Sequence, residues 1–490
     1  MRFVPLWLKG SCLPQESYLH PVSATSYFKG LSWLVFLNLL IKPVWVFLID
    51  RKVQLEVGHE VYGQYFACLA LSYVLLFIAD AGLSTLMNRE LAGDPQHALR
   101  PYLRLKLGML MVYGFVCFLT AAATGLHQWT FLAYVALIQG LTSLYVFLRN
   151  ILTAHQQFSA DAVFSVIDKT LMILFCGALL YLPFSEGLSL ERFLQIQTFC
   201  TALAVGAISV FLLRRHWLAG ERPLSYVSLL RQVLPFGVII LLQSLHFRLD
   251  GFLLERLHPQ GAAEAGIYAA AYRLLDAGNM AGYMVASFLV PFVARHRRDP
   301  ALIAAAVLRT RDVLLLPSLA LVAFALYFSP WLTRLLYHQS DTYLPHVLLL
   351  VLAALPAYYL VQVYGSVLTA TGRLRAFIYV LTGSVAVNVV LNLILIPSYG
   401  AAGSAWAALA SQYLGAAGCL LAAQQVLRIP LNPRSILRYG SCAGLLLLLF
   451  YGGKSAGWDV WIILASAALL VAAFLAAQTG AFKNYFASSR

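Results

Sequence analysis

The sequence predicts an all-α polytopic membrane protein with about fourteen transmembrane helices. Of the 490 residues, 61% are hydrophobic and only 11% are charged, against ~45–50% and ~25% in soluble domains. Apolar runs bounded by Gly, Pro or charged residues also recur along the whole chain. Because a bilayer-crossing helix needs about 20 apolar residues, about fourteen spans leave no room for a folded domain outside the membrane. An ordinary soluble enzyme is therefore excluded.

The expected spans follow one another in two groups of six, with two more helices at the end. An N-terminal lobe over 31–215 contains spans 31–49, 63–84, 107–125, 130–150, 162–183 and 194–213. After a cytoplasmic inter-lobe loop at 216–232, a C-terminal lobe over 233–425 contains 233–254, 265–291, 313–333, 345–369, 377–397 and 403–424. The last segment, 426–490, holds spans 439–453 and 460–478 and a tail.

Basic residues predict the orientation of these spans. With the N-terminus inside, the predicted cytoplasmic segments hold 24 of the 34 Lys and Arg residues and the external loops hold six. Cytoplasmic loops are enriched in Lys and Arg, so the net charge of +14 mainly reports orientation. The expected partners of this charge are anionic membrane lipids, and no nucleic acid is expected.

Residues 1–30 are expected to be a cytoplasmic N-terminal segment. They contain Arg2, Lys9 and Lys29 and lack an apolar core followed by a small-residue cleavage site, so no removable signal peptide is expected.

A short repeated motif occurs once in each lobe. Gly63-Gln64-Tyr65 opens the second span, and Gly266-Ile267-Tyr268 opens the eighth, each after an external loop with acidic residues. Repeats of six helices keep the same orientation, so they predict two lobes related by a pseudo-two-fold axis along the membrane normal, as in secondary transporters.

Polar residues inside the spans mark the candidate functional site, because ionisable groups in a bilayer are costly and normally face a protein interior or water. In span 265–291, one face carries Tyr268, Tyr272, Asp276, Asn279 and Tyr283, and Arg273 could pair with Asp276 at i and i+3. In span 233–254, Gln243, His246 and Asp250 share one face, opposite Ser244 and Arg248. In span 377–397, Ser384, Asn388 and Asn392 align.

Each of these groups also has a structural interpretation. The Asn and Ser faces suit interhelical hydrogen bonding equally well. Lys42, beside Pro43, is either a cavity cation or a structural counter-charge. Asp168 and Lys169 point about 100° apart on a helix and could each take a different partner, with structural pairing as the alternative to a functional role. Arg89 is either a substrate contact or a positive-inside anchor.

Other kinds of site are excluded. The seven Cys form no C-x-x-C or Cys/His pattern, so no metal site is expected. Gly453-Lys454-Ser455 lacks the first Gly of a phosphate loop, so no cofactor is expected. Any uphill transport would then draw on an ion gradient or on a partner ATPase. Asp80, Asp250 and Asp276 are the candidate residues for coupling to a proton or sodium gradient, or each is a structural ion-pair member instead.

Several motifs resemble the polysaccharide flippases of the multidrug/oligosaccharidyl-lipid/polysaccharide (MOP) exporter superfamily. They include Leu234-Pro235 through Asp250, Ala265-Gly266-Ile267-Tyr268, Val387-Asn388 through Leu393, and Ile396-Pro397-Ser398-Tyr399-Gly400. The first lobe matches more loosely, through Tyr62-Gly63-Gln64-Tyr65 and Asp80-Ala81-Gly82-Leu83. The cation-rich first-helix motif of the lipid II branch is not found.

The resemblance implies a flippase that moves a polyprenyl-diphosphate-linked oligosaccharide, such as an O-antigen of lipopolysaccharide, a capsule or an exopolysaccharide unit, across the bacterial inner membrane by alternating access. The expected contacts to diphosphate and glycan are Lys42, Arg89, Lys169, Arg248, Arg273, Tyr272, Asn279 and Asn388. A polysaccharide polymerase and other assembly proteins are possible partners. The alternatives are a cation-coupled multidrug exporter of the same superfamily and a membrane enzyme of polysaccharide assembly, which would usually need a longer external loop.

Overall fold

The computed structural model describes residues 37–38, 40–41, 43–93, 99–155, 157–181, 189–217, 225–296, 299–338, 341–427 and 433–488. The first part contains the π-helix η2 (Trp45–Asp50), α2 (Arg51–Leu75), α3 (Phe77–Asp80), α4 (Leu83–Gly93), α5 (Arg100–Thr124), α6 (Trp129–Ala154), α7 (Phe158–Tyr181) and α8 (Leu190–Arg214). Then follow α9 (Tyr226–Leu257), α10 (Gly261–Arg295), α11 (Pro300–Tyr337), α12 (Tyr343–Ala353), α13 (Leu355–Ala370), α14 (Leu374–Leu427), α15 (Pro433–Ser455) and α16 (Val460–Ser488).

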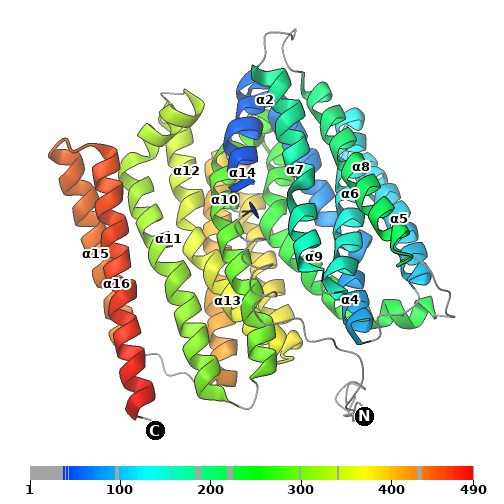
Figure 1. The fold of residues 1–490 in the computed structure, drawn as a ribbon. Helices are drawn as coiled ribbons and strands as arrows, with labels where there is room; N and C mark the ends of the chain where they lie inside the picture. Colours follow the sequence, from blue (N-terminus) through cyan, green and yellow to red (C-terminus); the bar gives the residue numbers. More distant parts are fainter. Residues whose placement is uncertain are drawn as a thin grey trace.

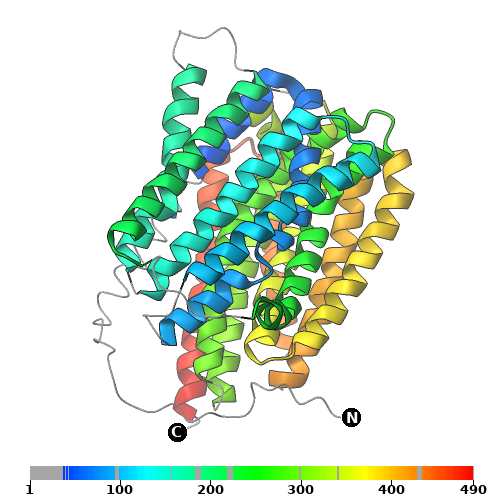
Figure 2. The same cartoon turned by 90° about the vertical axis from the view of Figure 1, so that its right-hand side faces the viewer.

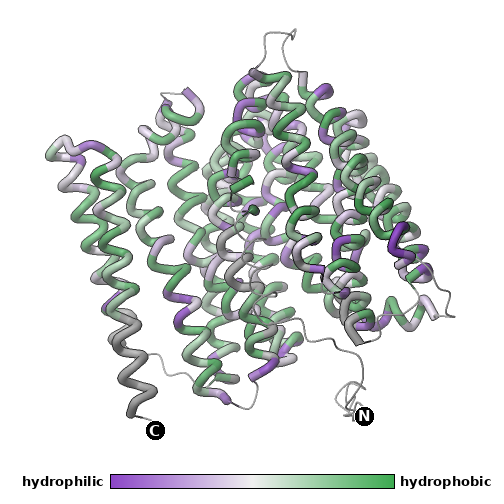
Figure 3. Tube along the Cα trace, in the orientation of Figure 1, coloured by the Kyte–Doolittle hydropathy of each residue, from purple (hydrophilic) through white to green (hydrophobic). Residues whose placement is uncertain are grey.

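The predicted fold class is confirmed: the regular elements of the described chain are all helical. Ten helical segments among the described residues are long and apolar enough to cross a membrane. Figures 1 and 2 show the long helices running side by side along a common direction. Apolar residues follow most of their length, and hydrophilic residues gather near helix ends and at some interior positions (Figure 3). The chain is a multi-pass membrane protein.

Several helices extend beyond the predicted spans into segments expected to be loops. The external loop expected at 50–62 is helical apart from a kink at Gly58, where φ is 80°. Helix α5 begins at Arg100 instead of residue 107, and α9 begins at Tyr226, inside the expected inter-lobe loop. Polar residues at these positions are part of the helices because backbone hydrogen bonding continues past the apolar run. The length of the apolar run marks only the part of the helix that is buried in the membrane.

Other predicted spans are broken or joined. The span expected at 63–84 ends in a break where Ala81 and Gly82 have φ of 46° and 92°. The span expected at 345–369 divides into α12 and α13 around Ala354, which precedes Leu355-Pro356. The two spans expected at 377–397 and 403–424 form one element, α14, bent at Gly400, where φ is 54°. The left-handed conformation at Gly58 and Gly400 is one that glycine adopts without a steric cost.

The C-terminal helices α15 and α16 lie at the edge of the molecule beside α11 (Figure 1). Their shared core includes Phe324 and Phe328 of α11, Cys442 and Phe450 of α15, and Ile463 of α16. The six cysteines within the described residues are all buried and free, as expected of packing residues.

Candidate functional site

Arg248 and Asp276 form an ion pair between α9 and α10. Arg248 Nη1 donates to Asp276 Oδ2 at 2.8 Å, and Nη2 donates to Oδ1 at 3.1 Å, so the pair is bidentate. The guanidinium also lies over the rings of Tyr73 and Tyr272, with 4.8 and 5.1 Å to the centroids. Both side chains remain partly exposed, at 22% and 30%. A partly exposed charge pair within a membrane span indicates access for water or a polar ligand.

Arg273 joins the two halves of the chain. Its Nε donates to Asp50 Oδ2 at 2.8 Å, across 223 residues of sequence. Its Nη1 donates to the Tyr337 hydroxyl at 3.3 Å, and its guanidinium lies over the Tyr62 ring at 5.1 Å. Arg273 is 5% exposed. The suggested pairing of Arg273 with Asp276 is therefore wrong, because each has a partner on another helix.

Gly63 and Gly266, the glycines of the repeated motif, lie at the contact between α2 and α10. A Cβ on Gly63 would lie 1.8 Å from the Ala262 carbonyl oxygen, and one on Gly266 would lie 2.0 Å from the His59 carbonyl oxygen. Gln54 Nε2 also donates to the Gly266 carbonyl oxygen at 2.8 Å. The backbones of the two halves thus meet directly, at the end of the helices that the basic-residue count assigns to the outside.

Asp250 lies in a buried polar cluster between α9, α10 and α14. Its carboxylate is 1% exposed and accepts hydrogen bonds from Tyr268 OH and Asn392 Nδ2, each at 2.9 Å. Asn392 Nδ2 also donates to Asn388 Oδ1 at 3.1 Å, and Asn392 Oδ1 accepts from Ser404 Oγ at 2.9 Å. Within the described residues these hydrogen-bond donors to the carboxylate are neutral. Asp250 differs in this respect from Asp80 and Asp276, whose partners are cations.

The same region contains polar atoms without partners. His246 lies one helical turn before Asp250 and its Nε2 is 3.2 Å from Ser411 Oγ. Its Nδ1, and Oε1 of the neighbouring Gln412, are buried and have no hydrogen-bond partner among the described residues. Since buried polar atoms are normally satisfied, this cluster has spare capacity for an ion or for water.

Two further charge pairs lie within the N-terminal half. Lys106 Nζ donates to Asp80 Oδ1 at 2.7 Å and to Ser143 Oγ at 2.8 Å, and the Lys106 side chain is fully buried. Lys169 Nζ lies 3.5 Å from Asp168 Oδ2 and 5.3 Å from the centroid of the Trp45 ring. Asp168 and Lys169 are therefore close enough to pair with each other, which favours the structural alternative.

The remaining predicted residues lie in different places. Asn279 is buried, and its Oδ1 accepts from Gln362 Nε2 of α13 at 3.3 Å. Tyr272 donates from its hydroxyl to the Phe247 carbonyl oxygen. Arg89 belongs to α4, but its side chain lies outside the part of the chain that the structure describes, and so does Lys42. The structure thus brings Arg248, Asp276 and Tyr272 together and keeps Lys169 and Asp80 apart from them, in separate pairs.

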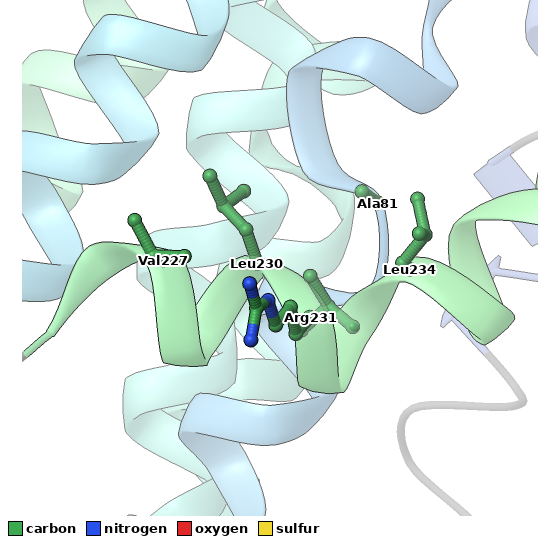
Figure 4. Close-up of a pocket in the computed structure, with 6 residues that line it drawn as sticks. Ala81, Val227, Leu230, Arg231 and Leu234 are labelled. Atoms are coloured by element: carbon green, nitrogen blue, oxygen red, sulfur yellow. The ribbon is translucent and has the colours of Figure 1, made fainter.

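An apolar groove of about 330 Å³ lies beside the break between α3 and α4. Figure 4 shows Val227, Leu230, Arg231 and Leu234 of α9 along it, opposite Ala81. Arg231 is its one charged lining residue. Since none of the predicted site residues lines this groove, it is separate from the charged pairs described above.

Three residues of these clusters are not marked by hydropathy. Apolarity alone places Lys106 in a loop, although its spacing from Tyr102 and Met109 on one buried face indicates a helix. Hydropathy also places Asp50 in a loop, and no local signal connects it with Arg273. Tyr73 carries no sequence signal either, because an aromatic residue in an apolar helix is ordinary.

Sequence comparison identifies the protein family to which the chain is related. A family model described as "Polysaccharide biosynthesis protein" matches residues 28–297, more than half of the chain. No curated protein sequence matches the chain.

Solved structures share the fold at low sequence identity. The lipid II flippase MurJ in an inward closed conformation has a TM-score of 0.66 at 12% identity, covering 92% of this chain and 98% of that one. An outward-facing multidrug resistance MATE family transporter of the MOP superfamily has a TM-score of 0.59 at 14% identity, over 82% and 96%. The Vibrio cholerae MATE transporter VcmN has 0.53 at 17% identity, over 82% and 96%.

These findings confirm the resemblance suggested by the sequence motifs. The similarity to MurJ and the MATE transporters covers most of the chain, although at such identities it establishes the fold alone. Family membership rests on the sequence match over residues 28–297. The chain belongs to the polysaccharide biosynthesis protein family and has the fold of the MOP-superfamily flippases and transporters.

Proposed function

We propose that this protein is a flippase that carries a polyprenyl-diphosphate-linked oligosaccharide across the membrane by alternating access. The observation that carries this proposal is Arg248, a partly exposed arginine at membrane depth in a member of a polysaccharide biosynthesis family. A lipid diphosphate is the anionic part of such a substrate. The planar guanidinium forms paired hydrogen bonds to carboxylates and phosphates alike, so phosphate oxygens can replace Asp276 on the same donors.

The surroundings of Arg248 also suit a glycan. Tyr73 and Tyr272 flank the guanidinium, and Tyr283, two turns after Asp276 on the same face of α10, is 50% exposed. Aromatic rings with a polar edge offer both an apolar face for a sugar ring and a hydroxyl for hydrogen bonding. The site therefore combines one cation for the diphosphate with aromatic surfaces for the sugars that follow it.

The first experiment tests the role of Arg248 in cells that display the glycan. We expect Arg248→Gln to reduce surface glycan at least about tenfold, since charge-assisted hydrogen bonds are worth about 1.5–3 kcal/mol and 1.4 kcal/mol is a factor of ten. Lipid-linked oligosaccharide should accumulate in the cytoplasmic leaflet. Arg334→Gln changes an exposed arginine of α11 and should leave display unchanged. Normal display with Arg248→Gln at wild-type protein level would contradict the proposal.

We further propose that Asp250 couples transport to a cation gradient. Its buried carboxylate lacks a cationic partner among the described residues, and the oxygen atoms of Asn388, Asn392 and Ser404 lie in the same cluster. Carboxylate and amide oxygens are suitable ligands for a hard cation, and a carboxylate can instead take up a proton. Asp80 and Asp276 are less suited, because Lys106 and Arg248 already neutralise them.

Proteoliposomes with an imposed sodium or proton gradient test this coupling. Asp250→Asn keeps the size of the side chain and removes its charge, so we expect flipping that no longer responds to the gradient used by the wild type. Asp161→Asn serves as the control, because Asp161 pairs with Arg149 elsewhere in the N-terminal half. If the wild type itself ignores both gradients, the coupling role of Asp250 is ruled out.

A further inference from the structure

Asp312 of α11 is the centre of a charge cluster that is separate from the proposed substrate site. It is 1% exposed and accepts hydrogen bonds from Arg311 Nε at 3.0 Å, from Arg438 Nη2 at 3.3 Å and from the Tyr439 hydroxyl. Arg438 and Tyr439 belong to α15, so the cluster joins the C-terminal helices to the rest of the molecule.

The charges in this cluster do not balance. Arg311 and Arg438 share Asp312, and in the described chain neither makes an ion pair with any other carboxylate. Both guanidiniums also lie over the Tyr439 ring, 5.3 and 5.6 Å from its centroid. One positive charge is therefore left over. A tether between α11 and α15 needs only one arginine for one carboxylate, so tethering does not account for the second.

The two arginines differ in exposure and in how many of their nitrogen atoms contact Asp312. The Arg311 side chain is 13% exposed, and both its Nε and its Nη2 lie 3.0 Å from Asp312 Oδ1. The Arg438 side chain is 30% exposed, and its Nε has no hydrogen-bond partner among the described residues. A guanidinium has five N–H donors, and Arg438 donates from one nitrogen to Asp312. Arg438 is therefore the arginine whose charge is both less neutralised and more accessible.

The position of Arg438 indicates which anion can reach it. Arg438 lies near the start of α15, and Arg311 lies in the first half of α11, at the end that the basic-residue count assigns to the cytoplasm. The adjacent residue Leu437 is 74% exposed, and Leu448, three turns further along α15, is 67% exposed. Apolar side chains exposed on a membrane helix face lipid chains. An arginine beside them is at the level of the lipid headgroups.

We propose that Arg438 binds the phosphate of an anionic phospholipid in the cytoplasmic leaflet, with its acyl chains along the exposed apolar face of α15. The guanidinium lies over the Tyr439 ring, Asp312 competes with the lipid for its donors, and Arg311 adds a second positive charge. The bound lipid neutralises the surplus charge and holds α15 and α16 against α11. This site is independent of the flippase activity and does not require the proposed substrate.

Native mass spectrometry of the purified full-length protein with added phosphatidylglycerol or phosphatidylcholine tests the site. We expect Arg438→Gln to weaken the tightest phosphatidylglycerol adduct about tenfold, the value of one charge-assisted phosphate contact. Phosphatidylcholine binding should change little. Arg375→Gln, which removes an exposed arginine at the start of α14, is the matched control and should retain the adduct.

Two further measurements separate a lipid site from a tether and from a free-phosphate site. Asp312→Asn removes the competing carboxylate, so phosphatidylglycerol should bind more tightly to any folded Asp312→Asn protein. Inorganic phosphate at millimolar concentration should not displace the lipid. If Arg438→Gln leaves phosphatidylglycerol binding unchanged, the cluster is only a tether between α11 and α15 and the proposal is overturned. Displacement of the lipid by inorganic phosphate would overturn the assignment to a lipid.

Discussion

Arg273 and Asp50 are a buried ion pair whose partners come from the two halves of the chain. With the Arg273 side chain 5% exposed and that of Asp50 19% exposed, neither charge has much access to water. Removing one partner of such a pair leaves the other charge uncompensated, which costs more than the pair itself contributes. The pair therefore specifies how the halves meet more than it adds to stability.

A double-mutant cycle tests this residue-scale claim. Arg273→Gln and Asp50→Asn should each lower the free energy of unfolding by about 3–5 kcal/mol, and the double variant should recover part of that loss. Lys52 and Glu56, an exposed i,i+4 pair on α2, are the control, with an expected coupling of about 0.3–0.5 kcal/mol. Strictly additive effects of the two changes would show that Arg273 and Asp50 do not interact.

Single residues were predictable from the sequence to the extent that their chemistry is unusual in a membrane. Arg248, Arg273 and Asp250 stand out because charge is rare in apolar helices. Their partners were less predictable: Asn392 is 142 residues from Asp250, and Asp50 is 223 residues from Arg273. Such contacts depend on how helices pack, and helical periodicity gives only the face on which a residue lies.

At the scale of elements, α2 and α10 approach each other closely across the two halves. Gly63 and Gly266 allow it because each lies against a carbonyl oxygen of the opposite helix. Contact of this kind requires the absence of a side chain on both sides. At the end that the basic-residue count assigns to the outside, α2 and α10 are thus held together by backbone packing, reinforced by the hydrogen bond from Gln54.

Substituting one of these glycines should open that end. Gly63→Ala places a methyl group 1.8 Å from the Ala262 carbonyl oxygen, so α2 and α10 must separate. We expect a cysteine introduced at Tyr283 to become more reactive toward a membrane-impermeant thiol reagent added from outside. Gly114→Ala in α5, where a methyl group meets nothing within 4 Å, is the control. Equal labelling of both variants would show that this contact does not close the external end.

Element types were predictable, whereas several element ends were not. Apolar runs placed the spans because the bilayer selects for them, but helices such as α5 and α9 continue into polar segments. The bend at Gly400 joins two predicted spans, and the break at Ala354 divides another. These features depend on local backbone conformation, to which hydropathy is insensitive.

At the scale of the whole molecule, the composition, the family match and the fold lead to one account. An apolar chain with few charges places its unusual residues where helices from different parts of the sequence meet. Arg248 between α9 and α10 is partly exposed, while Asp250 is buried among neutral oxygen atoms. This separation fits a carrier in which the anionic substrate and the driving cation occupy different places and interact through movement of the helices between them.

The most direct test of this account is a flipping measurement with the purified protein in proteoliposomes. A lipid-linked oligosaccharide is loaded in both leaflets, and an impermeant glycosidase reports what reaches the outer one. The account predicts that the wild-type protein exposes the inner-leaflet pool to the enzyme and that Arg248→Gln does so at least about tenfold more slowly. An inner-leaflet pool that stays protected in the presence of folded wild-type protein would contradict it.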